Sequence, residues 1–230
     1  MTSRSLFGSL ATALVLATPL ASQQPIDGRL AGRVSPAVVA VVRELAPAAA
    51  ARGLPIDPLI QKAIEGSAKG VPADLVAAAV RQVAAQLDTA AIALRSGGIA
   101  APDTTVIAAG GFAVTAGLHE TDIAELARAG APAAELMVGL RVAGTLAALG
   151  VPPADAADLV AGSLSTGRPA ADLLELPGRV QSEVAHGVTP AQAARGLARS
   201  AAAQQGRRGG GGGPPPGRGR PTHPPAHPHP

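Results

Sequence analysis

The chain contains no cysteine, tryptophan or tyrosine, and only two of its 230 residues are phenylalanine. The absence of cysteine excludes disulfide bonds, thiolate nucleophiles and thiolate metal ligands. Because aromatic residues are scarce, the core must be built from the aliphatic side chains that dominate the 47% hydrophobic fraction. Small side chains bury little area each, so the elements that carry them have to approach closely. Since alanine is also the strongest helix former, the composition predicts an all-α fold with closely packed helices.

Only one stretch of the sequence has the apolar character of a targeting segment. Arg4 is followed by an apolar run from Leu6 to Leu20 and then by small residues, which is the layout of a secretory signal peptide. The run is shorter than the roughly 20 residues that a membrane-spanning helix needs. We therefore expect residues 1–22 to be a cleavable signal peptide, with an ordinary buried or anchoring N-terminal helix as the alternative. The candidate cleavage positions are after Ala21, Ser22 or Ala17.

This reading places the protein outside the cytoplasm. We expect export to the periplasm or secretion, with no transmembrane span in the mature chain. The formal net charge is +3, but Arg4 and four arginines near the C-terminus supply five of the 19 basic residues. The remainder of the chain keeps 14 basic residues against 16 acidic ones. Because nucleic-acid binding depends on a clustered positive surface, this balance argues against a nucleic-acid partner.

A short phrase recurs along the sequence: a glycine, one further residue and then a proline. Glycine readily takes the left-handed conformation at a helix C-terminus, and proline suits the first turn of the next helix. Each phrase therefore predicts a joint between two helices. Acidic residues after several joints, such as Asp74 and Asp155, favour the positive end of the following helix dipole. The phrase begins at Gly53, Gly70, Gly130, Gly150 and Gly167, with looser versions at Gly117 and Gly187.

The joints are regularly spaced in the second half of the chain. Gly130 to Gly167 and Gly150 to Gly187 each span 37 residues, a period typical of helical-hairpin repeats. The residues match no named repeat signature. We therefore predict an all-α fold that is either a compact bundle or a short solenoid of helical hairpins joined by Gly-x-Pro turns.

The predicted helical domain spans residues 35–204, after a polar linker at residues 23–34. Ser35 and Pro36 have the N-cap and first-turn preferences that open a helix. Pro47 is expected to end or kink that helix, because proline cannot donate the backbone hydrogen bond of a helix interior.

The longest predicted helix runs from Pro72 to Arg95 and is amphipathic. Its apolar stripe recurs at spacings of three and four residues, which places the members on one face. The members of this stripe are Leu75, Ala79, Val83, Leu87, Ala90 and Leu94. Elsewhere, Gly110-Gly111 predicts a tight packing point or a kink, and Pro177-Gly178 predicts a helix break.

The stretch EGSAKGVPADLV, from Glu65 to Val76, contains Lys69 between two glycines and invites comparison with a phosphate-binding loop. A Walker-type loop has four residues between its glycines, then Lys and Ser or Thr, and it follows a strand. Here three residues separate Gly66 from Gly70, the lysine lies between them and no strand-like run precedes them. We interpret the stretch as a helix joint, in which Gly66 allows close helix packing.

The ionisable clusters that could support catalysis are incomplete. His119 is followed by Glu120, but a zinc-protease helix needs two histidines four residues apart. Glu183 and His186 have the Glu-x-x-His spacing of di-metal bundles, yet only one such motif occurs. We interpret His119 as part of a helix N-terminus and His186 as part of a helix C-terminus. The sequence therefore predicts no catalytic and no cofactor-binding residue.

Residues 205–230 are rich in Gly, Pro, Arg and His and lack apolar periodicity, so we predict a disordered tail. Its RGRP sequence at residues 218–221 matches the core of an AT-hook but lacks the flanking basic residues, and export would remove it from DNA. His223, His227 and His229 are the candidate metal ligands of the sequence, as a weak and unselective site. The tail otherwise suits a solvated spacer or an arm that contacts an anionic envelope surface.

Together these features favour a non-catalytic structural or interaction protein that binds an unknown protein partner through its helix surfaces. The alternative is a periplasmic carrier of an apolar small molecule or lipid held between helices. An enzyme is the third hypothesis, and it requires a pocket that gathers polar residues from several parts of the chain. The residues considered for such a pocket are Glu65, Lys69, His119 and His186. No cofactor is predicted, and no known family is recognised.

Overall fold

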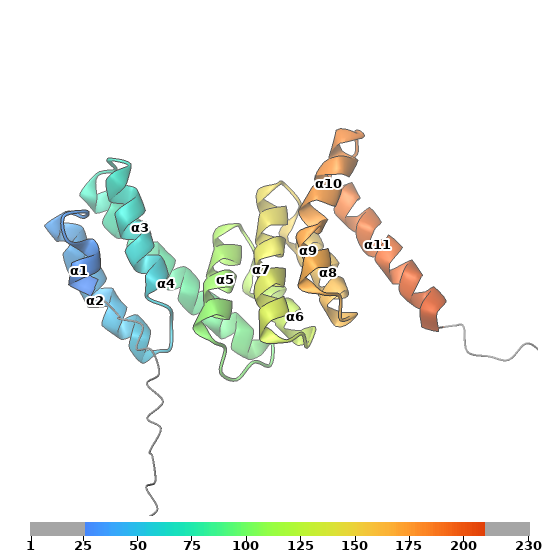
Figure 1. The fold of residues 1–230 in the computed structure, drawn as a ribbon, viewed down its shortest axis with the longest axis horizontal. Helices are drawn as coiled ribbons and strands as arrows, with labels where there is room; N and C mark the ends of the chain where they lie inside the picture. The colour runs from blue at the N-terminus through green and yellow to red at the C-terminus, as the bar shows by residue number, and fades with distance from the viewer. Residues whose placement is uncertain (1–25, 210–230) are drawn as a thin grey trace, which may run out of the picture.

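The computed structural model describes residues 26–209, with side chains up to residue 204, and these residues form helices and no strand. The predicted all-α fold is confirmed. Figure 1 shows an extended stack that runs from α1 and α2 at one end to α11 at the other. The helices are α1 (Ile26–Leu30), α2 (Pro36–Ala51), α3 (Asp57–Ala68), α4 (Ala73–Ser96), α5 (Thr104–Thr115), α6 (Glu120–Arg128), α7 (Ala133–Ala148), α8 (Pro153–Ser165), α9 (Ala170–Leu174), α10 (Leu176–Ala185) and α11 (Pro190–Gly209).

From α4 onward the helices stack in two rows (Figure 1). One row contains α4, α6, α8 and α11, which pack in that order, and the other contains α5, α7 and the pair α9 and α10, both of which pack against α7. Helices one 37-residue period apart are neighbours. For example, α8 begins at Pro153 and packs against α11, which begins at Pro190. This arrangement is the packing of a short solenoid of helical hairpins.

Glycines in the left-handed conformation separate the helices. After α2, Gly53 has a φ of 72°. Its N–H donates to the carbonyl of Ala50, and the N–H of Leu54 donates to that of Ala49, which satisfies the last carbonyls of the helix. The other predicted joint glycines also have positive φ: Gly70, Gly117, Gly130, Gly150, Gly167 and Gly187. A side chain at any of these positions would strain the backbone.

The Gly110-Gly111 pair is a packing point, because α5 is continuous through it. Both glycines lie against α4: a Cβ at Gly110 would lie 2.9 Å from the Cβ of Ala90, and one at Gly111 would lie 2.8 Å from a Leu87 methyl group. Such distances are shorter than a van der Waals contact. The expected close approach of small-residue helices is therefore present between α4 and α5.

Three boundaries differ from the prediction. Helix α1 lies inside the predicted linker at residues 23–34, since fully buried Leu30 holds it against the rest of the core. Pro47 lies within α2 without ending it. Proline has no N–H to donate to the carbonyl one turn earlier, but Pro47 is exposed, so that carbonyl can bond to water. Helix α11 continues past residue 204 to Gly209, through a stretch in which glutamine and two arginines are good helix formers.

Two further expectations concern helix ends. The break predicted at Pro177-Gly178 occurs at Glu175, between α9 and α10, and Pro177 lies in the first turn of α10. Helix α2 begins at Pro36 with Ser35 as its N-cap residue. The Ser35 hydroxyl makes no capping bond, however, and it is buried without a hydrogen-bond partner.

Several predictions concern residues outside the described part. The expected signal peptide, the RGRP sequence and the candidate ligands His223, His227 and His229 all lie there. Within residues 26–209, α4 is long and apolar enough to cross a membrane by length and composition. It packs against α2, α3, α5 and α6, and a core helix meets the same criterion. The absence of a transmembrane span in the mature chain thus stays a prediction.

Candidate binding groove

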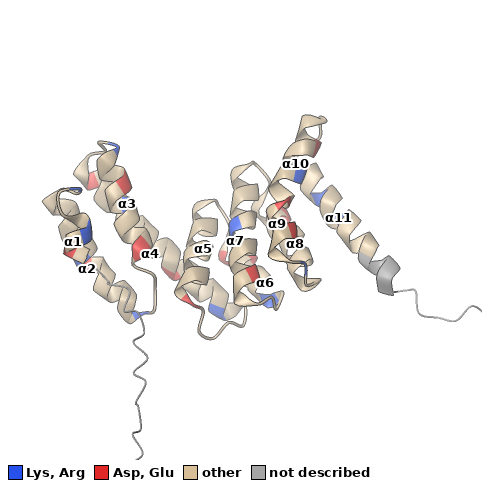
Figure 2. Ribbon diagram, in the orientation of Figure 1, with Lys and Arg blue, Asp and Glu red and all other residues tan. Residues whose placement is uncertain are grey.

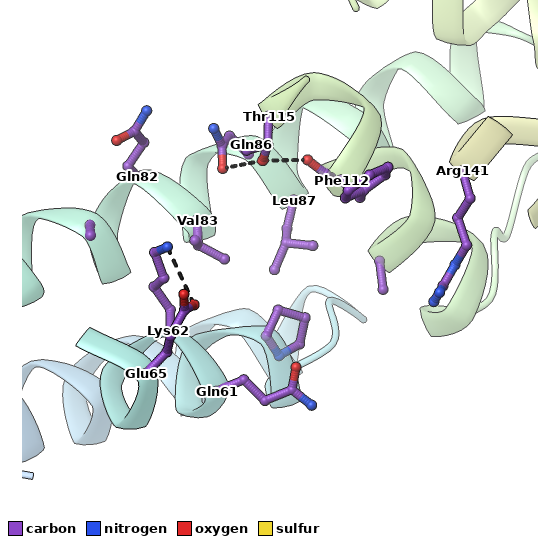
Figure 3. Close-up of a pocket in the computed structure, with 14 residues that line it drawn as sticks. Gln61, Lys62, Glu65, Gln82, Val83, Gln86, Leu87, Phe112, Thr115 and Arg141 are labelled. Atoms are coloured by element: carbon purple, nitrogen blue, oxygen red, sulfur yellow. Dashed lines mark hydrogen bonds and ion pairs between the residues drawn. The ribbon is translucent and has the colours of Figure 1, made fainter. Parts of the chain in front are cut away.

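On the side of α4 that the second row covers, a gap lies between α5 and the preceding helix α3. Helices α3 and α5 both pack against α4, but they make no extensive contact with each other, whereas α5 packs directly against α7. The space between them is an open groove of about 390 Å³. Figure 3 shows that α4 forms its floor and that α3 and α5 form its two walls.

The floor of the groove is apolar. It consists of Ala79, Val83 and Leu87 of α4. A second hollow of about 260 Å³ continues the groove along α3 and α4 toward Leu75, whose side chain is 56% exposed. These four residues are the first part of the apolar stripe predicted for α4. Leu75, Ala79 and Val83 therefore face the groove, whereas Leu87 is buried at its edge against Gly111 of α5.

The α5 wall is uncharged, since no Lys, Arg, Asp or Glu occurs in this helix (Figure 2). It presents Ala108, Gly111 and Phe112 to the groove. Phe112 is 46% exposed, and its ring packs over Gly144 of α7, where a Cβ would lie 2.8 Å from the ring. Phe112 is the only Phe, Tyr or Trp among the described residues. The groove therefore exposes the one aromatic side chain of the helical stack.

The α3 wall is charged and carries both lysines of the chain, Lys62 and Lys69. Both pair with Glu65: the Lys62 Nζ lies 3.6 Å from a Glu65 carboxylate oxygen, and the Lys69 ammonium donates a hydrogen bond to the other. The hydrogen bond from Lys69 and the charge of Lys62 lower the pKa of Glu65. Gly66 allows this wall to approach α4, since a Cβ there would lie 2.8 Å from a Val76 methyl group.

Polar side chains line the rim of the groove. The Thr115 hydroxyl lies 2.9 Å from both the Gln86 side-chain oxygen and the Gly111 carbonyl oxygen, and it can donate to one of them at a time (Figure 3). Gln82 and Gln61 extend the rim on α4 and α3. These groups provide hydrogen-bond donors and acceptors around an apolar floor.

Arg141 of α7 lies at the α5 end of the groove. In Figure 3 its side chain extends past the α5 wall toward the opening. Arg141 is exposed, and no carboxylate of the described residues forms an ion pair with it. Its guanidinium is therefore available to a negatively charged group that enters the groove.

The structure brings together only two of the four polar residues considered for a catalytic pocket. Glu65 and Lys69 are neighbours on α3. His119 begins α6, where its N–H donates to the Asp122 carboxylate at 2.8 Å, and its side chain is exposed. His186 ends α10, with its Nδ1 2.7 Å from the Ser182 carbonyl oxygen. Both histidines occupy the helix ends that the sequence predicts for them.

A second charged feature lies between α6 and α8. Glu125 of α6 faces Asp158 of α8, and partial burial together with the Asp158 charge raises the pKa of Glu125. Across residues 26–209, no group of three or more His, Cys, Asp or Glu side chains is arranged to hold a metal ion. The Glu125–Asp158 pair therefore bears on the stability of the α6–α8 contact.

Sequence reasoning did not identify Phe112 or Arg141 as binding residues. The rarity of two residue types is the one signal that points to the groove. The chain has two lysines and one phenylalanine after residue 25, and all three lie at this groove. Their joint position depends on how α3, α5 and α7 pack around α4, which no local pattern specifies.

Comparisons with known proteins yielded no relative. No family model matches the chain, and neither a curated protein nor a solved structure matches it.

Proposed function

We propose that this chain is an exported, non-catalytic interaction protein that holds a helix of a protein partner in the groove between α3 and α5. The observation that carries the proposal is the gap in the second row of helices. From α5 onward each helix of that row packs against the next, whereas between α3 and α5 the arc of α4 that carries Leu75, Ala79 and Val83 has no covering helix. An amphipathic helix lying in a groove between two others is a common mode of peptide recognition.

The composition of the groove matches that mode. Ala79, Val83 and Leu87 offer an apolar floor, and the α5 wall beside it carries no charged side chain. Exposed Phe112 supplies the kind of aromatic anchor that contributes strongly to protein interfaces. The glutamines and Thr115 at the rim can bond to the polar edge of a partner helix.

A carrier of an apolar small molecule or lipid is the second candidate. The groove volume of about 390 Å³ lies within the range of small-molecule pockets. A carrier pocket, however, surrounds most of its ligand with apolar side chains. Here Lys62, Glu65 and Arg141 border an open groove, which favours an extended polar-edged partner over an enclosed apolar ligand.

Native mass spectrometry of the protein recovered gently from the producing cells tests this proposal. The groove variant is Ala79→Gln/Ala108→Gln, which places two polar side chains in the floor and the α5 wall. The control is Ala78→Gln/Ala85→Gln, the same change at two exposed positions of α4. We expect a protein-sized adduct on the control that is lost from the groove variant. An adduct of small-molecule mass with the same pattern would establish the carrier, and an adduct of any size that persists on the groove variant would contradict a role for the groove.

A further inference from the structure

We infer that the helix received by the groove is acidic; this inference rests on the proposed function and names the chemistry of its partner. The charged side chains that line the groove and its continuation are Lys62, Lys69, Arg141 and Glu65. Three cations thus face one carboxylate. The chain between the N-terminal arginine and the C-terminal tail has more acidic than basic residues, so this positive groove departs from the charge of its surroundings.

On the α3 wall the single carboxylate cannot neutralise both ammonium groups. Glu65 pairs with Lys62 on one side and with Lys69 on the other. Their side chains remain 41% and 67% exposed, respectively, so each ammonium can bond to a further group. Lysine carries three N–H donors, and one carboxylate occupies only part of that capacity. A partner carboxylate beside α3 would complete these contacts.

At the opposite end Arg141 provides a second anchor. Its guanidinium has no carboxylate partner among the described residues and lies beside the uncharged α5 wall. Arginine binds a carboxylate through two parallel hydrogen bonds, which fixes the position of the bound group. Lys62 and Arg141 lie on different helices on the two sides of the groove floor (Figure 3).

The two walls together define the pattern of the partner helix. Its buried face carries aliphatic or small residues at helical spacing, since it lies on Ala79 and Val83 and against Ala108 and Phe112. The edge that faces α3 carries Asp or Glu. A further acidic residue lies near the end of the helix that reaches Arg141. Such charges steer association and select among helices that share the same apolar face.

A display library of amphipathic helices tests the inference. Every member has the same apolar face, while the flanking positions vary among acidic, basic and neutral residues. The library is selected for binding to the protein, which is expressed from the full 230-residue sequence and then purified. Counter-selection on Ala79→Gln/Ala108→Gln removes members that bind elsewhere, and Ala78→Gln/Ala85→Gln serves as the folded control. The measurement is the mean net charge of the groove-dependent members.

We expect the groove-dependent members to be enriched in Asp and Glu at the flanking positions. Groove-dependent members with neutral or basic flanks would overturn the acidic partner and leave the proposed helix-binding function in place. A selection that returns no groove-dependent member would contradict the proposed function itself.

Arg141→Gln sharpens the result, because this exposed residue makes no ion pair that the fold depends on. Removal of one exposed ion pair weakens binding by about threefold, so an acidic member should lose about that factor in affinity and a neutral member should lose none. The affinity of the acidic member should also fall more steeply with salt on the parent protein than on Arg141→Gln. Equal salt dependence on both proteins would exclude Arg141 as an anchor.

Discussion

The two halves of α4 carry the same apolar stripe, but only one half is covered. In the second half, Ala90 and Leu94 are fully buried, and α5 approaches them through Gly110. In the first half, Leu75 is 56% exposed and Val83 is only half-buried, because the next helix on that side of α4 is α3, across the groove. An apolar helical face therefore shows where a neighbour can pack, and the rest of the fold decides whether the same chain supplies it.

The difference between the halves follows from where the chain turns. The turn after α4 brings α5 back onto the second half, where glycines on α5 meet Ala90 and Leu87. Before α4, helices α2 and α3 bury a different arc of the first half, through Val76 and Val80. The uncovered arc is the groove floor.

The largest expected difference in the free energy of unfolding is between alanine substitutions at two leucines of α4. Leu94→Ala removes a fully buried side chain and should lower the free energy of unfolding by about 3 kcal/mol. Leu75→Ala removes a side chain from the groove and should change it by less than about 0.5 kcal/mol. Urea unfolding followed by circular dichroism measures both. Equal losses would show that Leu75 is covered in solution.

A second contrast concerns close packing at the end of the covered half. A Cβ at Gly97 would lie 2.5 Å from the Cβ of Ala127 and 2.6 Å from the backbone carbonyl of Ala124 on α6. Gly97→Ala should therefore destabilise the protein by about 2 kcal/mol through overpacking.

The matched control for this change is Gly162→Ala in the last turn of α8, where a Cβ would meet nothing within 4 Å. That substitution should stabilise the protein by about 0.5–1 kcal/mol, because alanine is the better helix former. Thermal unfolding of the two variants gives the comparison. A stabilised Gly97→Ala would mean that α4 and α6 are further apart than described.

A smaller change in stability is expected when Glu125, at the contact between α6 and α8, is substituted. Its pKa is raised by partial burial and by the charge of Asp158, so the folded state favours the protonated carboxyl. The associated stability is fully present below the ordinary pKa of a glutamate and is lost as the pH rises through the raised value. Glu125→Gln should therefore stabilise the protein at pH 7 by about 0.5 kcal/mol, the scale of an exposed charge pair.

This advantage should vanish near pH 3, well below the ordinary pKa of glutamate, where Glu125 is protonated in both folded and unfolded chains. Urea midpoints of the parent protein and Glu125→Gln at the two pH values provide the measurement. An advantage that is the same at both pH values would indicate a packing effect in place of the electrostatic one.

The sequence was sufficient to predict features that depend on neighbouring residues along the chain. Gly53 and the six other joint glycines have positive φ because the left-handed helix end is a local requirement. The extent of α4 follows from its own periodicity, and it differs from the prediction by one residue at each end. Pro47 shows the limit of such rules, since an exposed proline in the last turns of a helix is tolerated when water replaces the lost donor.

The groove could not be predicted in the same way. It arises where α3, α4, α5 and α7 meet, and their residues are far apart in the sequence. Leu75 and Leu94 belong to one stripe and differ in burial only through their neighbours. Lysine and phenylalanine are rare in this sequence, but only the packed structure shows that Lys62, Lys69 and Phe112 share one location.

Site-specific crosslinking tests the central claim most directly. The chain has no cysteine, so Ala79→Cys on the groove floor and Ala85→Cys on the exposed face of α4 each provide one attachment point for a photoreactive maleimide. The labelled proteins are returned to an extract of the producing cells, illuminated, and analysed by peptide mass spectrometry. We predict that Ala79→Cys forms adducts with one amphipathic helical segment of a protein and that Ala85→Cys does not. Adducts of equal yield from the two positions, or adducts of Ala79→Cys with lipids alone, would contradict the account.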